Sequence, residues 1–148
     1  MKLKDVLKDK GRTVHSITPT GTINEALALM NAMRVGSLMV IDDKGIQGIL
    51  SERDILRCVG TVPSDFRKRP VGEAMTPKDR LVVAHQDDDL NYAMNVMTEK
   101  RIRHVPVIDD QGAIQGIVSV GDIIKAMRVD KDIEIKFLLE YIEGKYPG

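Results

Sequence analysis

The sequence of 148 residues contains no tryptophan, two phenylalanines, three tyrosines and a single cysteine. Aliphatic residues and the eight methionines must therefore fill any core, and an apolar fraction of 43% is enough to build one. One cysteine, Cys58, excludes an internal disulfide and is typical of a reducing compartment. The first residues lack the apolar stretch of a signal peptide, so the sequence predicts a cytoplasmic globular protein.

The chain also lacks an excess of either charge, because 22 basic residues balance 22 acidic ones. A balanced chain exerts no long-range field on nucleic acid or an anionic membrane, so neither is an expected partner. No apolar run approaches the roughly 20 residues that a bilayer span needs. Glycine-rich phosphate loops are absent, and His15, His85 and His104 lack the spacing of metal ligands. The sequence therefore predicts neither a metal site nor a catalytic centre, and we do not expect an enzyme.

What the sequence does contain is a long internal repeat. Residues 40–56 match residues 107–124, with one extra residue at the turn in the second copy. The offset is 67 residues before the turn and 68 after it, and the same register pairs Met30 with Met97 further back in the chain. Two copies are too few for a solenoid, but they can pair face to face about a pseudo-two-fold axis.

Each copy has the same predicted order of elements. A short extended segment, 13–17 or 81–84, precedes a helix whose apolar residues recur at helical spacing. A strand, a tight Asp-Asp-x-Gly turn and a second strand follow, and Ser51 or Ser119 then opens a second helix. The predicted fold is α+β and sandwich-like, with two β-α-β-β-α repeats about the pseudo-two-fold axis and a C-terminal helix.

The predicted boundaries place the first repeat at 1–60, a linker at 61–69, the second repeat at 70–128, and the C-terminal helix and tail at 129–148. That helix is expected over 130–143, where apolar residues form a stripe. Packing on its own repeat and contact with a second copy both explain the stripe, and a homodimer is the expected state. The stripe consists of Ile133, Phe137, Leu138, Tyr141 and Ile142.

Both copies carry a Ser-x-x-Asp sequence at the start of the second helix, Ser51 to Asp54 and Ser119 to Asp122. One interpretation is a helix cap, although a capping box prefers the longer Glu or Gln at the fourth position. The other is a ligand site, because a carboxylate can accept hydrogen bonds from both hydroxyls of a ribose and the helix start favours phosphate. The repetition of the pair favours the second interpretation.

The pattern Gly-hydrophobic-x-Ser-x-x-Asp in both copies, preceded in the second by the stretch 101–109, resembles the CBS domains, named after cystathionine β-synthase. The resemblance extends from about Leu3 to Met127. It implies a disc-like Bateman module that binds AMP, ADP, ATP, NAD or S-adenosylmethionine between its repeats and signals to a regulated partner protein.

The resemblance also implies roles for individual residues. Asp54 and Asp122 are expected to accept the ribose hydroxyls, while Ser51 and Ser119 line the phosphate side. Base contacts are expected from backbone and apolar groups around Val14, Val35, Leu81, Val105 and Pro106.

The two copies differ where a phosphate is expected. The first carries Arg53 and Arg57 where the second carries glycine and Lys125. Arg103 stands where the first copy has glycine, a position from which some nucleotide-sensing relatives reach a phosphate in the opposite repeat. The three arginines are therefore expected to gather at the site of Asp54, with fewer cations at the second site. Arginines exposed on the surface without a ligand are the alternative.

The leading hypothesis is a regulatory module that binds an adenosyl ligand and senses energy or redox state. The alternative is a ligand-free scaffold that only dimerises and docks a partner. A third hypothesis is a fragment of a larger CBS-bearing enzyme or transporter. The sequence contains no catalytic or membrane segment, and this counts against that hypothesis.

Overall fold

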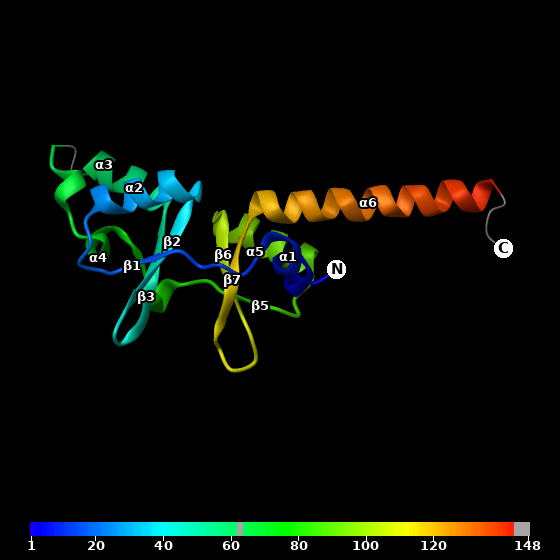
Figure 1. Ribbon diagram of the computed structural model, residues 1–148. Helices are drawn as coiled ribbons and strands as arrows, with labels where there is room; N and C mark the ends of the chain where they lie inside the picture. Colours follow the sequence, from blue (N-terminus) through cyan, green and yellow to red (C-terminus); the bar gives the residue numbers. More distant parts are fainter. Residues whose placement is uncertain (62–63, 144–148) are drawn as a thin grey trace. The chain divides into compact units, whose positions relative to one another are not determined.

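The computed structural model describes residues 1–61 and 64–143, and it divides into two compact units (Figure 1). The first-repeat unit comprises residues 13–82, and the second-repeat unit combines residues 1–12 with residues 83 onward. Each unit contains one sheet with its own helices. The predicted α+β fold of two repeats is therefore confirmed. The predicted linker includes residues 62–63, which lie outside the described residues.

A four-stranded sheet forms the first-repeat unit, in the order β1 (Ser16–Ile17), β2 (Ser37–Asp42), β3 (Gly45–Ser51) and β4 (Thr76–Pro77). Only β1 and β2 run parallel. Aliphatic side chains of the central strands pack against α2 (Ile23–Met33), α3 (Glu52–Thr61) and the short α4 (Val71–Ala74). Two 3-10 helices, Phe66–Lys68 and Lys78–Arg80, flank α4 and β4. The buried core consists of Ile23, Ala26, Met30, Leu38, Val40, Leu50, Ile55 and Val71.

The second-repeat unit has a three-stranded sheet in the order β5 (Ala84–His85), β6 (His104–Ile108) and β7 (Ile114–Ser119). Its helices are α5 (Leu90–Lys100), α6 (Val120–Ile142) and α1 (Leu3–Lys10), which comes from the far end of the sequence. Three side chains of α1 lie inside this core because they repeat at helical spacing on one face. They are Leu3, Val6 and Leu7.

The two repeats share their local stereochemistry. Thr22 and Asp89 cap the first helix of each repeat by accepting the amide N–H three residues on. Arg34 and Arg101 end those helices in the left-handed conformation, each with φ of 55°. In each hairpin the strand register shifts at the same place, after Val40 in one repeat and after Val107 in the other. The internal repeat of the sequence is thus a repeat of backbone conformation.

The compact units differ from the division by chain order, because each is completed by a segment that precedes the opposite repeat. Helix α1 precedes the first repeat and packs on the second, while α4 and β4 precede the second repeat and pack on the first. Gly48 permits the second arrangement, since β4 lies directly against its Cα. The four-part division at 1–60, 61–69, 70–128 and 129–148 stays a prediction for the limits of the sequence repeats.

The expectation of a separate helix over 130–143 is corrected by the structure. The second helix of the repeat and the expected C-terminal helix form one helix of 23 residues, α6. The reason is in the sequence, which has neither glycine nor proline from Asp122 to Glu143. Figure 1 shows α6 continuing well past α1 and α5 of its own unit. No helix in the described part of the chain has both the length and the apolar character that crossing a bilayer requires.

Candidate functional site

The carboxylate of Asp54 is buried at the start of α3, with 3% of the residue exposed. Its Oδ2 accepts the Ser51 amide at 2.9 Å and the Ser51 hydroxyl at 3.1 Å. Its Oδ1 accepts the Thr76 hydroxyl at 3.1 Å and contacts the guanidinium of Arg57 at 3.3 Å. Both carboxylate oxygens are therefore engaged, so a ligand hydroxyl that binds Asp54 has to replace one of these contacts.

The corresponding carboxylate of Asp122 lies at the start of α6 and is more accessible, with 24% of its side chain exposed. Its Oδ2 accepts the Ser119 amide at 2.8 Å and forms an ion pair with the ammonium of Lys10 at 2.6 Å. Lys10 Nζ also donates to the carbonyl oxygen of Ile117 at 2.6 Å. The end of α1 is thus fixed to the second Ser-x-x-Asp sequence by a charged contact.

These contacts keep Asp122 ionised. Burial alone raises the pKa of Asp122, but the hydrogen bonds from Lys10 and from the Ser119 amide outweigh it and hold the pKa below its ordinary value. The stabilisation that the carboxylate provides is therefore present at neutral pH and is lost as the pH falls through the lowered pKa.

Ser and Asp form reciprocal caps at both helix starts. The amides of Asp54 and Asp122 donate back to the hydroxyls of Ser51 and Ser119, at 3.4 and 3.1 Å. The capping box, which the sequence disfavoured for the shorter aspartate, is therefore the geometry that both repeats adopt. This cap leaves Asp122 Oδ1 without a partner among the described residues, so capping and ligand binding are compatible there.

The remaining expected site residues are divided between the units. Val14, Val35 and Leu81 are half-buried in the first-repeat unit, which also contains Asp54. Val105 and Pro106 are buried in β6, where they pair with Val118 and Ile117 of β7.

The cations are exposed in both units. Arg53 and Arg57 are exposed on α3, and Lys125 is exposed on α6. Arg103 is exposed in the second-repeat unit, where its carbonyl oxygen accepts the amide of Val120 at 2.9 Å. Arg57 is the one for which the structure gives a contact with Asp54. The gathering of Arg53 and Arg103 at that site stays a prediction.

Sequence reasoning missed Lys10 and Thr76. Both contact a motif aspartate, and both lie in the segment that precedes the opposite repeat. A signal was present for the first, because Leu3, Val6 and Leu7 predict a helix whose last turn carries Lys10 and which ends at Gly11. Which carboxylate this lysine meets depends on tertiary packing and is not encoded locally.

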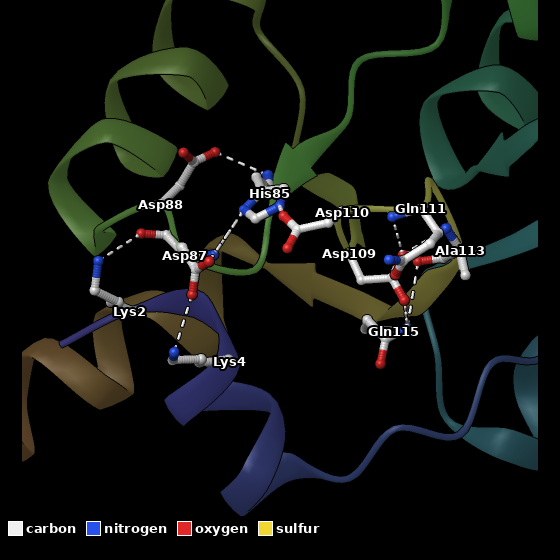
Figure 2. Close-up of polar contacts among 10 residues, drawn as sticks. All are labelled: Lys2, Lys4, His85, Asp87, Asp88, Asp109, Asp110, Gln111, Ala113 and Gln115. Carbon is white, nitrogen blue, oxygen red and sulfur yellow. Dashed lines mark hydrogen bonds and ion pairs between the residues drawn. The ribbon is translucent and has the colours of Figure 1, made fainter.

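A second polar cluster joins β5 to the hairpin of the second-repeat unit (Figure 2). The imidazole of His85 accepts the Asp87 amide at Nδ1, at 3.1 Å, so that Nε2 donates to Asp110 at 2.7 Å. Asp87 also pairs with the ammonium of Lys4 at 2.9 Å, and that hydrogen bond lowers the pKa of Asp87. The sequence predicted no metal site. In the structure His85, Asp87 and Asp110 bring possible ligand atoms within 4.8 Å of one another. Asp87 and Asp110 lie at opposite ring nitrogens of His85, and the ion pair with Lys4 connects Asp87 to α1.

Comparison with known proteins identifies the class to which this fold and these motifs belong. The sequence model of the CBS domain matches residues 3–61 and 71–129. The chain belongs to the CBS-domain family, as the sequence predicted, and it contains two such domains.

Particular relatives are similar along most of their length. The mitochondrial CBS domain-containing protein CBSX3 of Arabidopsis thaliana is 34% identical over 97% of this chain and 73% of its own. The solved structure of the CBS-domain protein ATU1752 from Agrobacterium tumefaciens is 35% identical, with a TM-score of 0.80 over 85% of this chain and 92% of its own. The CBS domain protein PAE2072 from Pyrobaculum aerophilum, solved in complex with AMP, is 26% identical, with a TM-score of 0.70 over 82% of this chain and 89% of its own.

Proposed function

We propose that the protein is a regulatory module that binds an adenine nucleotide at its Ser-x-x-Asp helix starts and catalyses no reaction. The observation that carries the proposal is the duplicated carboxylate, held at a helix start by Ser51 in one repeat and by Ser119 in the other. An AMP complex of a family member supports the class of ligand.

The proposed contacts follow from the chemistry of the helix start. An ionised aspartate is an acceptor only, and it suits a ribose because both sugar hydroxyls can donate to it. The first turn of α3 or α6 carries the positive end of the helix dipole, which favours a phosphate nearby. AMP, ADP, ATP and NAD share this ribose and phosphate. We therefore propose an adenosyl ligand of this group, with S-adenosylmethionine as the charged alternative that lacks a phosphate.

Replacing either aspartate with asparagine tests this function. Asparagine has the shape of aspartate and keeps a carbonyl oxygen that can accept the amide of the capping serine, so folding is retained while the charged acceptor is lost. We expect Asp54→Asn and Asp122→Asn each to weaken AMP binding at their own site by about 1.5–3 kcal/mol, which is typical of a lost hydrogen bond to a charged group. Isothermal titration calorimetry measures the change.

The matched control is Asp43→Asn, because Asp43 is exposed in the first hairpin, away from the helix start. It should leave the affinity unchanged. Affinities that are unchanged in both motif variants would reduce the Ser-x-x-Asp sequence to a helix cap and favour the ligand-free scaffold.

The exposed end of α6 supports a homodimer in either case. Large apolar side chains on several faces of this helix are 47–79% exposed, and a helix that is apolar on most sides is normally covered. A second copy fits, because residues 124–132 carry three basic and two acidic side chains whereas residues 133–143 carry three acidic and one basic. Antiparallel pairing brings these opposite charges together. The exposed apolar residues are Val129, Ile133, Ile135, Phe137, Leu138, Leu139 and Ile142.

The double substitution Ile135→Glu and Leu138→Glu should therefore convert a dimer to a monomer. Each protomer loses two apolar side chains from the interface, at about 1.5–3 kcal/mol each, so the four losses raise the dissociation constant by about ten-thousandfold or more. Light scattering at micromolar concentration measures the mass. The exposed Lys136→Gln on the same helix is the control, and a monomeric mass of the unsubstituted protein contradicts the prediction.

A further inference from the structure

The cation that pairs with the aspartate distinguishes the second Ser-x-x-Asp sequence from the first: Asp122 pairs with Lys10 of α1, whereas Asp54 pairs with Arg57 of its own helix. The ammonium of Lys10 has three donor hydrogens, and two of them are used by Asp122 Oδ2 and by the carbonyl oxygen of Ile117. No contact to a third group exists among the described residues. Lys10 and Asp122 are 40% and 24% exposed at their side chains, so both are within reach of a small molecule.

Asp122 therefore offers an acceptor and a donor side by side. In the described part of the chain no hydrogen bond to its Oδ1 is present, so this oxygen can accept a ligand hydroxyl, while the neighbouring ammonium can donate to an anion. In the first repeat the hydroxyl of Thr76 and the guanidinium of Arg57 contact Asp54, at 3.1 and 3.3 Å, and both carboxylate oxygens are engaged. The second carboxylate is thus more available, and its cation lies closer, at 2.6 Å against 3.3 Å between Arg57 and Asp54.

We propose that Lys10 makes the site at Asp122 select a phosphorylated nucleoside over the uncharged nucleoside. The proposal rests on the proposed function and names the residue that would determine which ligand this site prefers. A sugar hydroxyl that donates a hydrogen bond to Asp122 weakens the hold of the carboxylate on the ammonium. A phosphate restores an anionic partner to that ammonium, whereas an uncharged nucleoside does not. Phosphate binding and release of the Lys10 contact are therefore coupled.

Titration of AMP and adenosine against the full chain tests the proposal. Asp54→Asn silences the first site, and Lys10→Met removes the ammonium while retaining the aliphatic stem. We expect Lys10→Met to reduce the ratio of AMP affinity to adenosine affinity by about tenfold, mainly by weakening AMP. Lys8→Met is the matched control, because Lys8 is exposed on the same helix. An equal ratio with Lys10 and with methionine overturns the proposal.

Two further measurements keep the outcome unambiguous. Repeating the titrations with Asp54 retained covers the case in which asparagine disturbs folding. In the ligand-free protein, carbon-detected NMR should show the pKa of Asp122 rising in Lys10→Met and staying low in Lys8→Met. An unchanged pKa in Lys10→Met would show that the ion pair is not formed and would overturn the proposal. Absence of binding of both compounds to the unsubstituted chain overturns the proposed function and the selectivity with it, whereas binding without a Lys10 effect overturns only the selectivity.

Discussion

Substitution of Leu7 with alanine is expected to lower the free energy of unfolding by about 2–5 kcal/mol, the usual range for a buried leucine. Leu7 is 0% exposed, and its side chain lies against Gly116 of β7, which has no side chain of its own to fill the space. Alanine leaves a cavity there that neither α1 nor the sheet can close without moving. Chemical denaturation measures the loss.

Hydrogen exchange locates the effect. Amides of β6 and β7 should exchange faster in Leu7→Ala, while those of β2 and β3 should change less, because α1 packs in the second-repeat unit. Lys8→Ala on the exposed side of α1 is the control and should change the free energy by less than about 0.5 kcal/mol. Faster exchange in β2 and β3 alone would contradict the assignment of α1 to the second repeat.

Substitution of Gly48 with alanine is the second change from which we expect a large loss. A Cβ at this position would lie 2.2 Å from the carbonyl oxygen of Thr76, and that atom is backbone and cannot rotate away. Strand β4 must therefore separate from β3, at a cost of about 3 kcal/mol in unfolding free energy, toward the upper end for an overpacked site. Thermal and chemical denaturation measure it.

The same substitution reaches the candidate site, because Thr76 donates to Asp54 through its hydroxyl. Movement of β4 should therefore lower both the AMP affinity of the first site and the free energy of unfolding. Gly60→Ala is the control: outside its own helix, no atom of the described residues lies within 4 Å of its Cβ position, and alanine favours the helix it occupies. A Gly48→Ala protein as stable as the Gly60→Ala protein would contradict the close approach of β3 and β4.

The fold was predictable because the signals for it are local and occur twice. The Asp-Asp-x-Gly turns formed as predicted, with Gly45 and Gly112 at positive φ. The predicted first strands formed over only two residues each, at Ser16–Ile17 and Ala84–His85, because short edge strands make few ladder contacts. What the sequence did not predict is the exchange of segments between repeats, which depends on contacts between residues 107 positions apart for α1 and 22 positions apart for β4.

The candidate site was predictable in its aspartates and serines and incomplete in its cations. The first repeat carries Arg53 and Arg57 where the second carries one cation, Lys125. Comparison of the repeats therefore predicts fewer cations at the second site. The structure adds Lys10, which lies outside the repeated stretch and meets Asp122 only after α1 has packed. Aligning the repeats at an offset of 67 residues compares only positions within the repeats. It gives no information about α1, which lies outside the repeated stretch and packs on the second repeat.

The packing of α1 on the second repeat has a consequence for synthesis on the ribosome. The ribosome makes α1 before the second repeat, because the carbonyl of Ile117 that Lys10 binds follows 107 residues later. At about 5–20 residues per second, roughly 5–20 s pass before the apolar face formed by Leu3, Val6 and Leu7 can reach its native partner. The first-repeat unit needs nothing beyond residue 82 and can fold during that interval. The first-repeat unit should therefore fold before the second, with α1 among the last of these elements to be covered.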